Sequence, residues 1–276
     1  MIRNPWGGRG LIAGCLRLLE NVGNWLLYWA GASYGVVHLI GTCLAWIIGG
    51  PLFGRPIRLS TISLHIFELG LKSLPVTILF AFSFGLVTAL QVTVFQQSID
   101  YLPPILRLVG NFVARDQAPA FVGILLAARA GGAITSEIST MVFDREVLAL
   151  RSMGIDPLRF IVAPALLAMA VATPILSLVM TAVQIVTLAL YLFFAKGIAP
   201  IFVIDLAVEG ISGTDLMLNA TKSVIFGLVV LGISARSGLT VVESGRSTGS
   251  ATTFAVVASI VVVLLINALM SILGPE

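Results

Sequence analysis

The segment Thr140-Met-Val-Phe-Asp-Arg-Glu-Val-Leu-Ala-Leu-Arg-Ser-Met-Gly-Ile-Asp-Pro157 is a short charged island between two long apolar stretches in the middle of the chain. Its apolar residues recur near helical spacing: Phe143, Val147, Leu150 and Met153. Charged residues are interleaved with them: Asp144, Arg145, Glu146 and Arg151. A helix this short cannot cross a bilayer, which needs about 20 apolar residues. The pattern predicts an amphipathic helix that contacts something outside the membrane.

Composition assigns most of the remaining chain to lipid. Hydrophobic residues make up 58% and charged residues 11% of 276 positions, whereas soluble domains carry about 25% charged residues. The mean hydropathy is +1.06. A net charge of +3, with no clustering on one face, argues against nucleic-acid binding. The cysteines Cys15 and Cys43 and the two histidines have no metal-ligand spacing, so no metal or other cofactor is expected in this chain.

Charge-poor runs predict an all-α polytopic membrane protein with five spanning helices. The expected spans are residues 73–97, 117–136, 160–195, 216–235 and 248–273. We expect a loop at 98–116, marked by Pro103-Pro104, and a moderately polar connection at 196–215. The third run is longer than the hydrocarbon core requires, so Pro164 and Pro174 are expected kink points.

The N-terminal region is rich in interfacial aromatic residues. Residues 21–54 carry no charge and hold Trp25, Tyr28, Trp29, Tyr34 and Trp46. Trp and Tyr favour the headgroup level, which favours a helix lying in the interface; a simple crossing is the alternative. Most Lys and Arg residues fall on one side if the N-terminus is cytoplasmic. This distribution predicts that the charged island is cytoplasmic and that the loop at 98–116 lies outside.

The sequence lacks the common motifs of nucleotide-binding proteins and hydrolases. The sequence contains no G-x-x-x-x-G-K-[ST] phosphate loop, H-E-x-x-H or G-x-S-x-G. The chain is therefore not expected to be an enzyme, and any work it performs must draw energy from a partner. The charged island is the candidate docking element for an ATPase.

Four blocks of residues resemble the permeases of MlaE-type ABC transporters. They are Ala118-Pro-Ala-Phe-Val-Gly-Ile-Leu-Leu-Ala-Ala-Arg-Ala-Gly-Gly-Ala-Ile-Thr-Ser-Glu-Ile138, Met153-Gly-Ile-Asp-Pro157, Thr221-Lys-Ser-Val-Ile-Phe-Gly227 and Ser247-Thr-Gly-Ser-Ala-Thr-Thr253. Their order and spacing match the family over residues 73–275. The resemblance implies one domain, 1–276, in which 1–72 form an interfacial elbow region and 73–275 the transmembrane core. It also implies that the charged island is the coupling helix.

The same resemblance implies partners and a location. Such permeases are homodimers in the bacterial inner membrane and move phospholipids or related lipids between that membrane and the outer envelope. They pair with cytoplasmic ABC ATPase subunits, which bind ATP and Mg, and with a periplasmic MCE-domain protein. A small cytoplasmic STAS-type regulator is a further expected partner.

This chain departs from the family pattern at three positions. The family's ELGP appears as Asp116-Gln-Ala-Pro119, which shortens the acidic side chain. Arg151 stands where the coupling segment often has an acid, and Asn267 stands where a relative has Asp. These changes affect the surface offered to the ATPase and an intramembrane polar contact.

Several side chains have two readings. In the first hypothesis Lys222 forms an ion pair with Asp116, and Arg115 lies near a lipid headgroup. In the alternative, all three side chains anchor helix ends at the membrane interface. Phe95, Gln96 and Ile99 line a lipid cavity between two subunits, or simply face lipid. Arg129 and Glu137 share one helix face, where Arg129 serves an interface or is a structural arginine. The apolar residues of the charged island are expected to insert into a groove of the ATPase, with Arg145 and Glu146 setting the orientation of the bound helix. In the alternative, the helix rests on the membrane surface.

The best-supported function is thus the permease subunit of a lipid-transporting ABC complex. A stand-alone secondary transporter or channel would need a relay of membrane acids or histidines, which the sequence lacks. A membrane scaffold for an envelope complex is the remaining alternative, and it predicts that changes in the cavity are silent.

Overall fold

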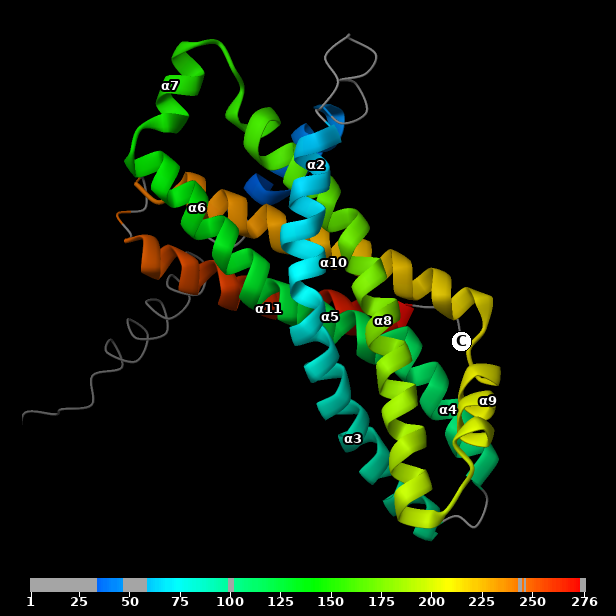
Figure 1. Cartoon of the computed structure of the whole chain (residues 1–276). Helices are drawn as coiled ribbons and strands as arrows, with labels where there is room; N and C mark the ends of the chain where they lie inside the picture. The colour runs from blue at the N-terminus through cyan, green and yellow to red at the C-terminus, as the bar shows by residue number, and fades with distance from the viewer. Residues whose placement is uncertain (1–33, 47–58, 99–101, 243–244, 246, 274–276) are drawn as a thin grey trace, which may run out of the picture.

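The computed structural model describes residues 34–46, 59–98, 102–242, 245 and 247–273, and these residues form helices and the turns between them (Figure 1). Five continuous helical stretches are long and apolar enough to cross a membrane: Thr61–Phe95, Leu102–Phe143, Leu158–Lys196, Gly213–Leu239 and Thr248–Leu273. We refer to them as spans 1 to 5. The expectation of an all-helical, five-span protein is confirmed.

Each of the first three spans is assembled from shorter helical segments. Span 1 contains α2 (Leu59–His65), η1 (Ile66–Gly70), η2 (Leu71–Ser73) and α3 (Leu74–Ser98). Span 2 contains α4 (Leu102–Phe112), η3 (Val113–Gln117), α5 (Ala118–Leu126), η4 (Ala127–Gly131) and α6 (Gly132–Phe143). Span 3 contains η5 (Leu158–Val162) and α8 (Ala163–Lys196). Spans 4 and 5 are α10 (Gly213–Leu239) and α11 (Thr248–Leu273).

The junctions η1, η3, η4 and η5 are π-helical turns. Each carries charged residues, among them Glu68, Asp116, Arg129 and Arg159. A π turn widens the helix and leaves backbone carbonyl groups without their usual partner four residues on, so nearby side chains can bond them. The wide turns are therefore places at which a charged side chain enters a span.

The expected loop at 98–116 is wrong, because residues 102–112 form α4 and continue into span 2. Pro103 and Pro104 occupy the first turn of α4, where a proline costs nothing because its missing N–H would have no helical partner. The connection at 196–215 likewise contains a helix, α9 (Pro200–Glu209). Figure 1 shows α4 and α9 side by side at the end of the bundle opposite α7 (Glu146–Ser152).

Close backbone contact holds α4 and α9 together. A Cβ atom added at Gly110 would lie 2.1 Å from the carbonyl oxygen of Ala207, and one at Gly210 would lie 2.2 Å from that of Arg107. The side chains of Arg107 and Glu209 also pair, with Nη2 and Oε2 3.0 Å apart. Small residues that let helix backbones approach are the usual packing device where lipid removes the hydrophobic driving force.

The core lies where spans 2, 3 and 4 meet. Its largest buried side chains include Phe226, Leu166, Met169 and Leu126. Pro164 lies in the first turn of α8 and α8 continues through Pro174 to Lys196. Span 5, in contrast, exposes most of its apolar residues. Its outer face is therefore suited to lipid or to another protein.

Within the aromatic N-terminal region the structure describes the helical residues Tyr34–Trp46, a stretch that is by itself shorter than a membrane span. Leu39 and Cys43 are buried against the core, whereas Tyr34 is exposed. Trp25, Tyr28 and Trp29 lie outside the described residues. The described part of this region is therefore a short helix packed on the side of the bundle.

Candidate functional site

The charged island is not one continuous helix. α6 ends at Phe143, and α7 begins at Glu146 after a turn in which Arg145 has φ 61°. Asp144 and Arg145 thus break the expected periodicity, because the left-handed conformation of Arg145 reverses the chain. Phe143 closes span 2 and Met153 follows α7, so these two residues do not extend an α7 face as the sequence suggested.

Burial along the charged island is correspondingly uneven. Val147 is buried and Leu150 is partly buried. Phe143 and Met153 are 48% and 72% exposed, and Leu148 is also exposed. The charged side chains of Arg145, Glu146 and Arg151 are exposed as well. The island therefore anchors through Val147 and presents a mixed apolar and charged surface at the end of the bundle.

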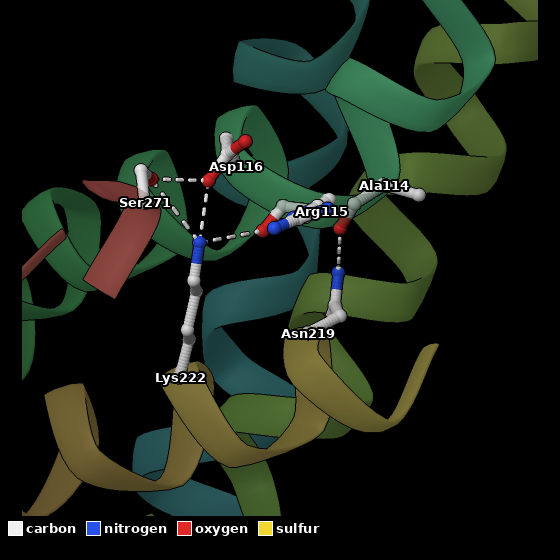
Figure 2. Close-up of polar contacts among 6 residues, drawn as sticks. All are labelled: Ala114, Arg115, Asp116, Asn219, Lys222 and Ser271. Atoms are coloured by element: carbon white, nitrogen blue, oxygen red, sulfur yellow. Dashed lines mark hydrogen bonds and ion pairs between the residues drawn. The ribbon is translucent and has the colours of Figure 1, made fainter. Parts of the chain in front are cut away.

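A buried lysine stands near the opposite end of the bundle. The Lys222 side chain is 1% exposed and its Nζ pairs with the Asp116 carboxylate (Figure 2). Nζ also donates to the carbonyl oxygen of Arg115 at 3.2 Å and to Ser271 Oγ at 3.3 Å. Ser271 Oγ in turn donates to Asp116. All three ammonium protons of Lys222 thus have acceptors, as a buried charge requires. We call Asp116, Lys222 and Ser271 the outer polar cluster.

The π turn η3 supplies the backbone acceptors of this region. The N–H of Ala118 bonds the carbonyl of Val113, five residues earlier. The carbonyls of Ala114 and Arg115 accept hydrogen bonds from the side chains of Asn219 and Lys222 on α10 (Figure 2). The wide turn therefore joins span 2 to span 4 through its own backbone.

Polar residues continue along one face of α10. Asn111 Nδ2 donates to Asp215 Oδ2 at 2.7 Å, and Asp215 also caps α10 together with Ser212. Asp215, Asn219 and Lys222 are spaced four and three residues apart, so all three face α4 and η3. Sequence reasoning found Lys222 and Asp116 but missed Asn111, Asp215, Asn219 and Ser271. The helical spacing of the α10 residues was the available signal.

The other residues predicted to line a lipid cavity are placed unevenly. Phe95 is exposed near the end of α3 and takes no part in the hydrogen bonds of the outer polar cluster. Gln96 lies in α3, and Ile99 lies outside the described residues. Asn267 lies on α11, one turn before Ser271, and its buried Oδ1 has no hydrogen-bond partner among the described residues.

A second polar region lies between spans 1 to 4, nearer α7. Arg129 and Glu137 both line a pocket of about 200 Å³. Arg129 Nη1 donates to Ser73 Oγ of span 1. His65, Glu68 and Lys72 also line this inner pocket. In the described part of the chain no group of His, Cys, Asp and Glu is arranged to hold a metal ion.

A five-span apolar bundle that buries a polar network and presents a short helix at one end has the architecture of a membrane permease. Comparison with known families gives the particular class. Residues 62–273 match the family Permease MlaE, and the chain belongs to this family. It is therefore a multi-pass permease subunit of an ABC transporter, and ATP hydrolysis takes place in a partner subunit.

Relatives come from bacteria and from a plant. A probable ABC transporter permease protein of Rickettsia prowazekii is 28% identical over 93% of this chain and 97% of its own length. The intermembrane phospholipid transport system permease protein MlaE of Haemophilus influenzae is 28% identical over 79% of this chain and 83% of its own. The chloroplast protein TRIGALACTOSYLDIACYLGLYCEROL 1 of Arabidopsis thaliana is 29% identical over 60% of this chain and 48% of its own.

Proposed function

We propose that this permease moves phospholipids or related lipids between the bacterial inner membrane and the outer envelope, driven by its partner ATPase. The Haemophilus influenzae relative is an intermembrane phospholipid transport permease, which supports the substrate class. The observation that carries the proposal is the buried Lys222, which is 1% exposed and paired with Asp116 inside a largely apolar bundle. A charge kept at membrane depth is costly and typically marks a transport pathway.

The outer polar cluster and its surroundings form the proposed lipid site. Asp116 is 22% exposed, so the ion pair is reachable from one side. Arg115 would lie near a phosphate-bearing headgroup, Lys222 would stay paired with Asp116 beside it, and Phe95, Gln96 and Ile99 would contribute to the walls that hold acyl chains. Asn267 would supply a hydrogen bond beside the pair, because its Oδ1 is buried and unpartnered in the described structure.

The charged island is the proposed coupling element. Exposed Phe143 and Met153 would enter a groove of the ATPase, while buried Val147 and partly buried Leu150 tie the island to the bundle. Arg145, Glu146 and Arg151 would set orientation more than affinity. ATP and Mg would be bound by the ATPase and not by this chain.

The proposed assembly is a homodimer with two ATPase subunits, a periplasmic MCE-domain protein and a small STAS-type cytoplasmic regulator. The largely exposed apolar residues of span 5 support a helix surface available to lipid or to a second copy. Residues 1–276 would act as one domain, with 73–275 as its transmembrane core.

A reconstituted complex tests this function. Lipid transfer between proteoliposomes and acceptor vesicles is measured with and without ATP for the wild type, Lys222→Ala and the control Lys196→Ala, which removes an exposed lysine near the same end. We expect ATP-dependent transfer that Lys222→Ala reduces at least tenfold while ATP hydrolysis persists. Transfer without the ATPase would favour a secondary transporter. Undiminished transfer by Lys222→Ala would favour a scaffold and remove the residue from the mechanism.

A further inference from the structure

The inner pocket is lined by residues at the ends of spans 1, 3 and 4 that the Lys and Arg distribution predicts to be cytoplasmic. Its lining residues Glu68 and Lys72 precede the charge-free part of span 1, which starts at Ser73. Ile161 and Val162 follow Arg159 at the start of span 3, and Ala235 precedes Arg236 at the end of span 4. With the orientation indicated by the Lys and Arg distribution, these ends are cytoplasmic. The pocket is thus separate from the outer polar cluster, 13 residues away along span 2 as measured from Asp116 to Arg129.

Among the described residues, the inner pocket contains both a paired and an unpaired set of charged side chains. Glu68 and Lys72 neutralise each other, because Oε1 and Nζ are 3.3 Å apart. Arg129 and Glu137 make ion pairs neither with each other nor with another residue in the part of the chain that the structure describes. One cation and one anion therefore share a pocket without cancelling.

A hydrogen bond to span 1 fixes the Arg129 side chain at the pocket. Ser73, which is buried, accepts a hydrogen bond from Nη1 and itself donates to the carbonyl of Leu69, so the guanidinium is fixed from span 1. A guanidinium has five N–H donors in a planar fork that matches phosphate oxygens. Its position in the π turn η4 places it on the pocket wall.

Glu137 completes a two-charge pattern. It lies eight residues after Arg129, about 12 Å along a helix axis, and both residues line the pocket. Glu137 is exposed, whereas Arg129 is only partly exposed. The pattern of inner cation and outer anion complements a headgroup with an inner phosphate and an outer ammonium.

We propose that the inner pocket binds the zwitterionic headgroup of a cytoplasmic-leaflet phospholipid, with Arg129 on the phosphate and Glu137 on the ammonium. This inference rests on the proposed function for its substrate class. It adds a second site, at which lipid is selected by headgroup on the cytoplasmic side. Apolar Ile134 and Ala165 in the lining give the start of the acyl chains a dry surface.

The test captures lipid at the pocket itself. Ala133 lines the pocket and is exposed, so a diazirine amino acid placed there in the full complex would crosslink whatever lies inside. The complex is placed in nanodiscs of equal phosphatidylethanolamine and phosphatidylglycerol, without ATP, and captured lipids are identified by mass spectrometry. We expect phosphatidylethanolamine to be enriched.

Variants separate the two charges. Arg129→Gln should lower total capture about tenfold, as expected for loss of charge-assisted hydrogen bonds, and Arg129→Lys, which keeps the charge but loses the planar fork, should restore only part of it. Glu137→Gln should keep capture but lower the ratio of phosphatidylethanolamine to phosphatidylglycerol about threefold. Arg107→Gln, a charge removal at the far end of the bundle, should change neither value.

Equal capture by Arg129→Gln and the wild type, or an unchanged ratio in Glu137→Gln, would overturn the proposal. Displacement of the captured lipid by millimolar inorganic phosphate would assign the pocket to a soluble anion and also overturn it. Lipid transfer by the same complexes is scored separately. Capture without ATP-dependent transfer would count against the proposed function alone, and transfer with no selective capture would count against the inner pocket alone.

Discussion

Gly110 of α4 lies directly against the backbone of Ala207 of α9. A Cβ at Gly110 would approach the Ala207 carbonyl oxygen to 2.1 Å, closer than any real contact, and the obstacle is backbone that no rotamer change can move. Together with the matching contact of Gly210 and Arg107, this fixes α4 on α9 at one end of the bundle.

Gly110→Ala should therefore separate α4 from α9. We expect a loss of about 1–3 kcal/mol, typical of overpacking, measured by thermal unfolding of the detergent-solubilised chain. Gly213→Ala is the matched control, because a Cβ there meets nothing within 4 Å. Equal melting temperatures for the two variants would show that α4 and α9 do not pack this closely.

The buried ion pair should behave asymmetrically in a double-mutant cycle. Lys222→Met alone leaves the Asp116 carboxylate without its cation and should cost about 3–5 kcal/mol. Lys222→Met combined with Asp116→Leu removes both charges and should recover most of that loss. Additive effects of the two single changes, measured by unfolding in detergent, would contradict direct coupling between the residues.

The left-handed conformation of Arg145 gives a prediction about the charged island. Arg145→Gly should keep the turn and stabilise it slightly, by up to about 1 kcal/mol, because glycine adopts positive φ without strain. Arg145→Val should destabilise the turn, since a β-branched side chain disfavours this conformation. Protease cleavage between α6 and α7 reports the difference, and faster cleavage of the Gly variant than of the Val variant would refute the assignment.

Exposed and buried apolar residues of the charged island should respond differently to charge. Met153→Glu should weaken binding of the ATPase at least tenfold in a pull-down while the permease keeps its melting temperature. Val147→Glu should lower the melting temperature itself, because it buries an unpaired carboxylate. If Met153→Glu binds the ATPase normally, Met153 lies outside the coupling surface.

Cys43 should be an unreactive thiol. Burial, with a smaller contribution from Asp156, raises the pKa of the Cys43 thiol to about 12. Because the thiolate is the reactive form, its fraction stays very small from pH 7 to 9, well below this pKa. In a Cys15→Ser background, maleimide labelling should remain slow over that range and rise only on denaturation. Fast labelling at pH 8 would mean that the helix Tyr34–Trp46 does not pack on the bundle.

Hydropathy predicted the number of spans because lipid demands long apolar runs, and span 5 agrees with the expected 248–273. It failed at α4, where Pro103 and Pro104 were taken as loop signals although they lie in the first turn of a helix, and at α9, which lies within the stretch 196–215 that was expected to be a moderately polar connection. The pairing of Lys222 with Asp116 was predictable from the cost of isolated charge. The hydrogen bonds of Asn219 to the Ala114 carbonyl and of Ser271 to the Lys222–Asp116 pair were not predictable, because they depend on the π turn η3 and on the packing of span 5.

The wide turns η3 and η4 have a consequence for aligning relatives with this chain. Each residue of a regular α-helix advances about 100° around the axis, and a π turn interrupts that angular count. A helical wheel drawn through span 2 at a uniform period would therefore assign Asp116 and Arg129 to wrong faces relative to each other. Gaps of one residue in alignments near 113–117 and 127–131 are best read as a wide turn gained or lost, with the faces on either side preserved.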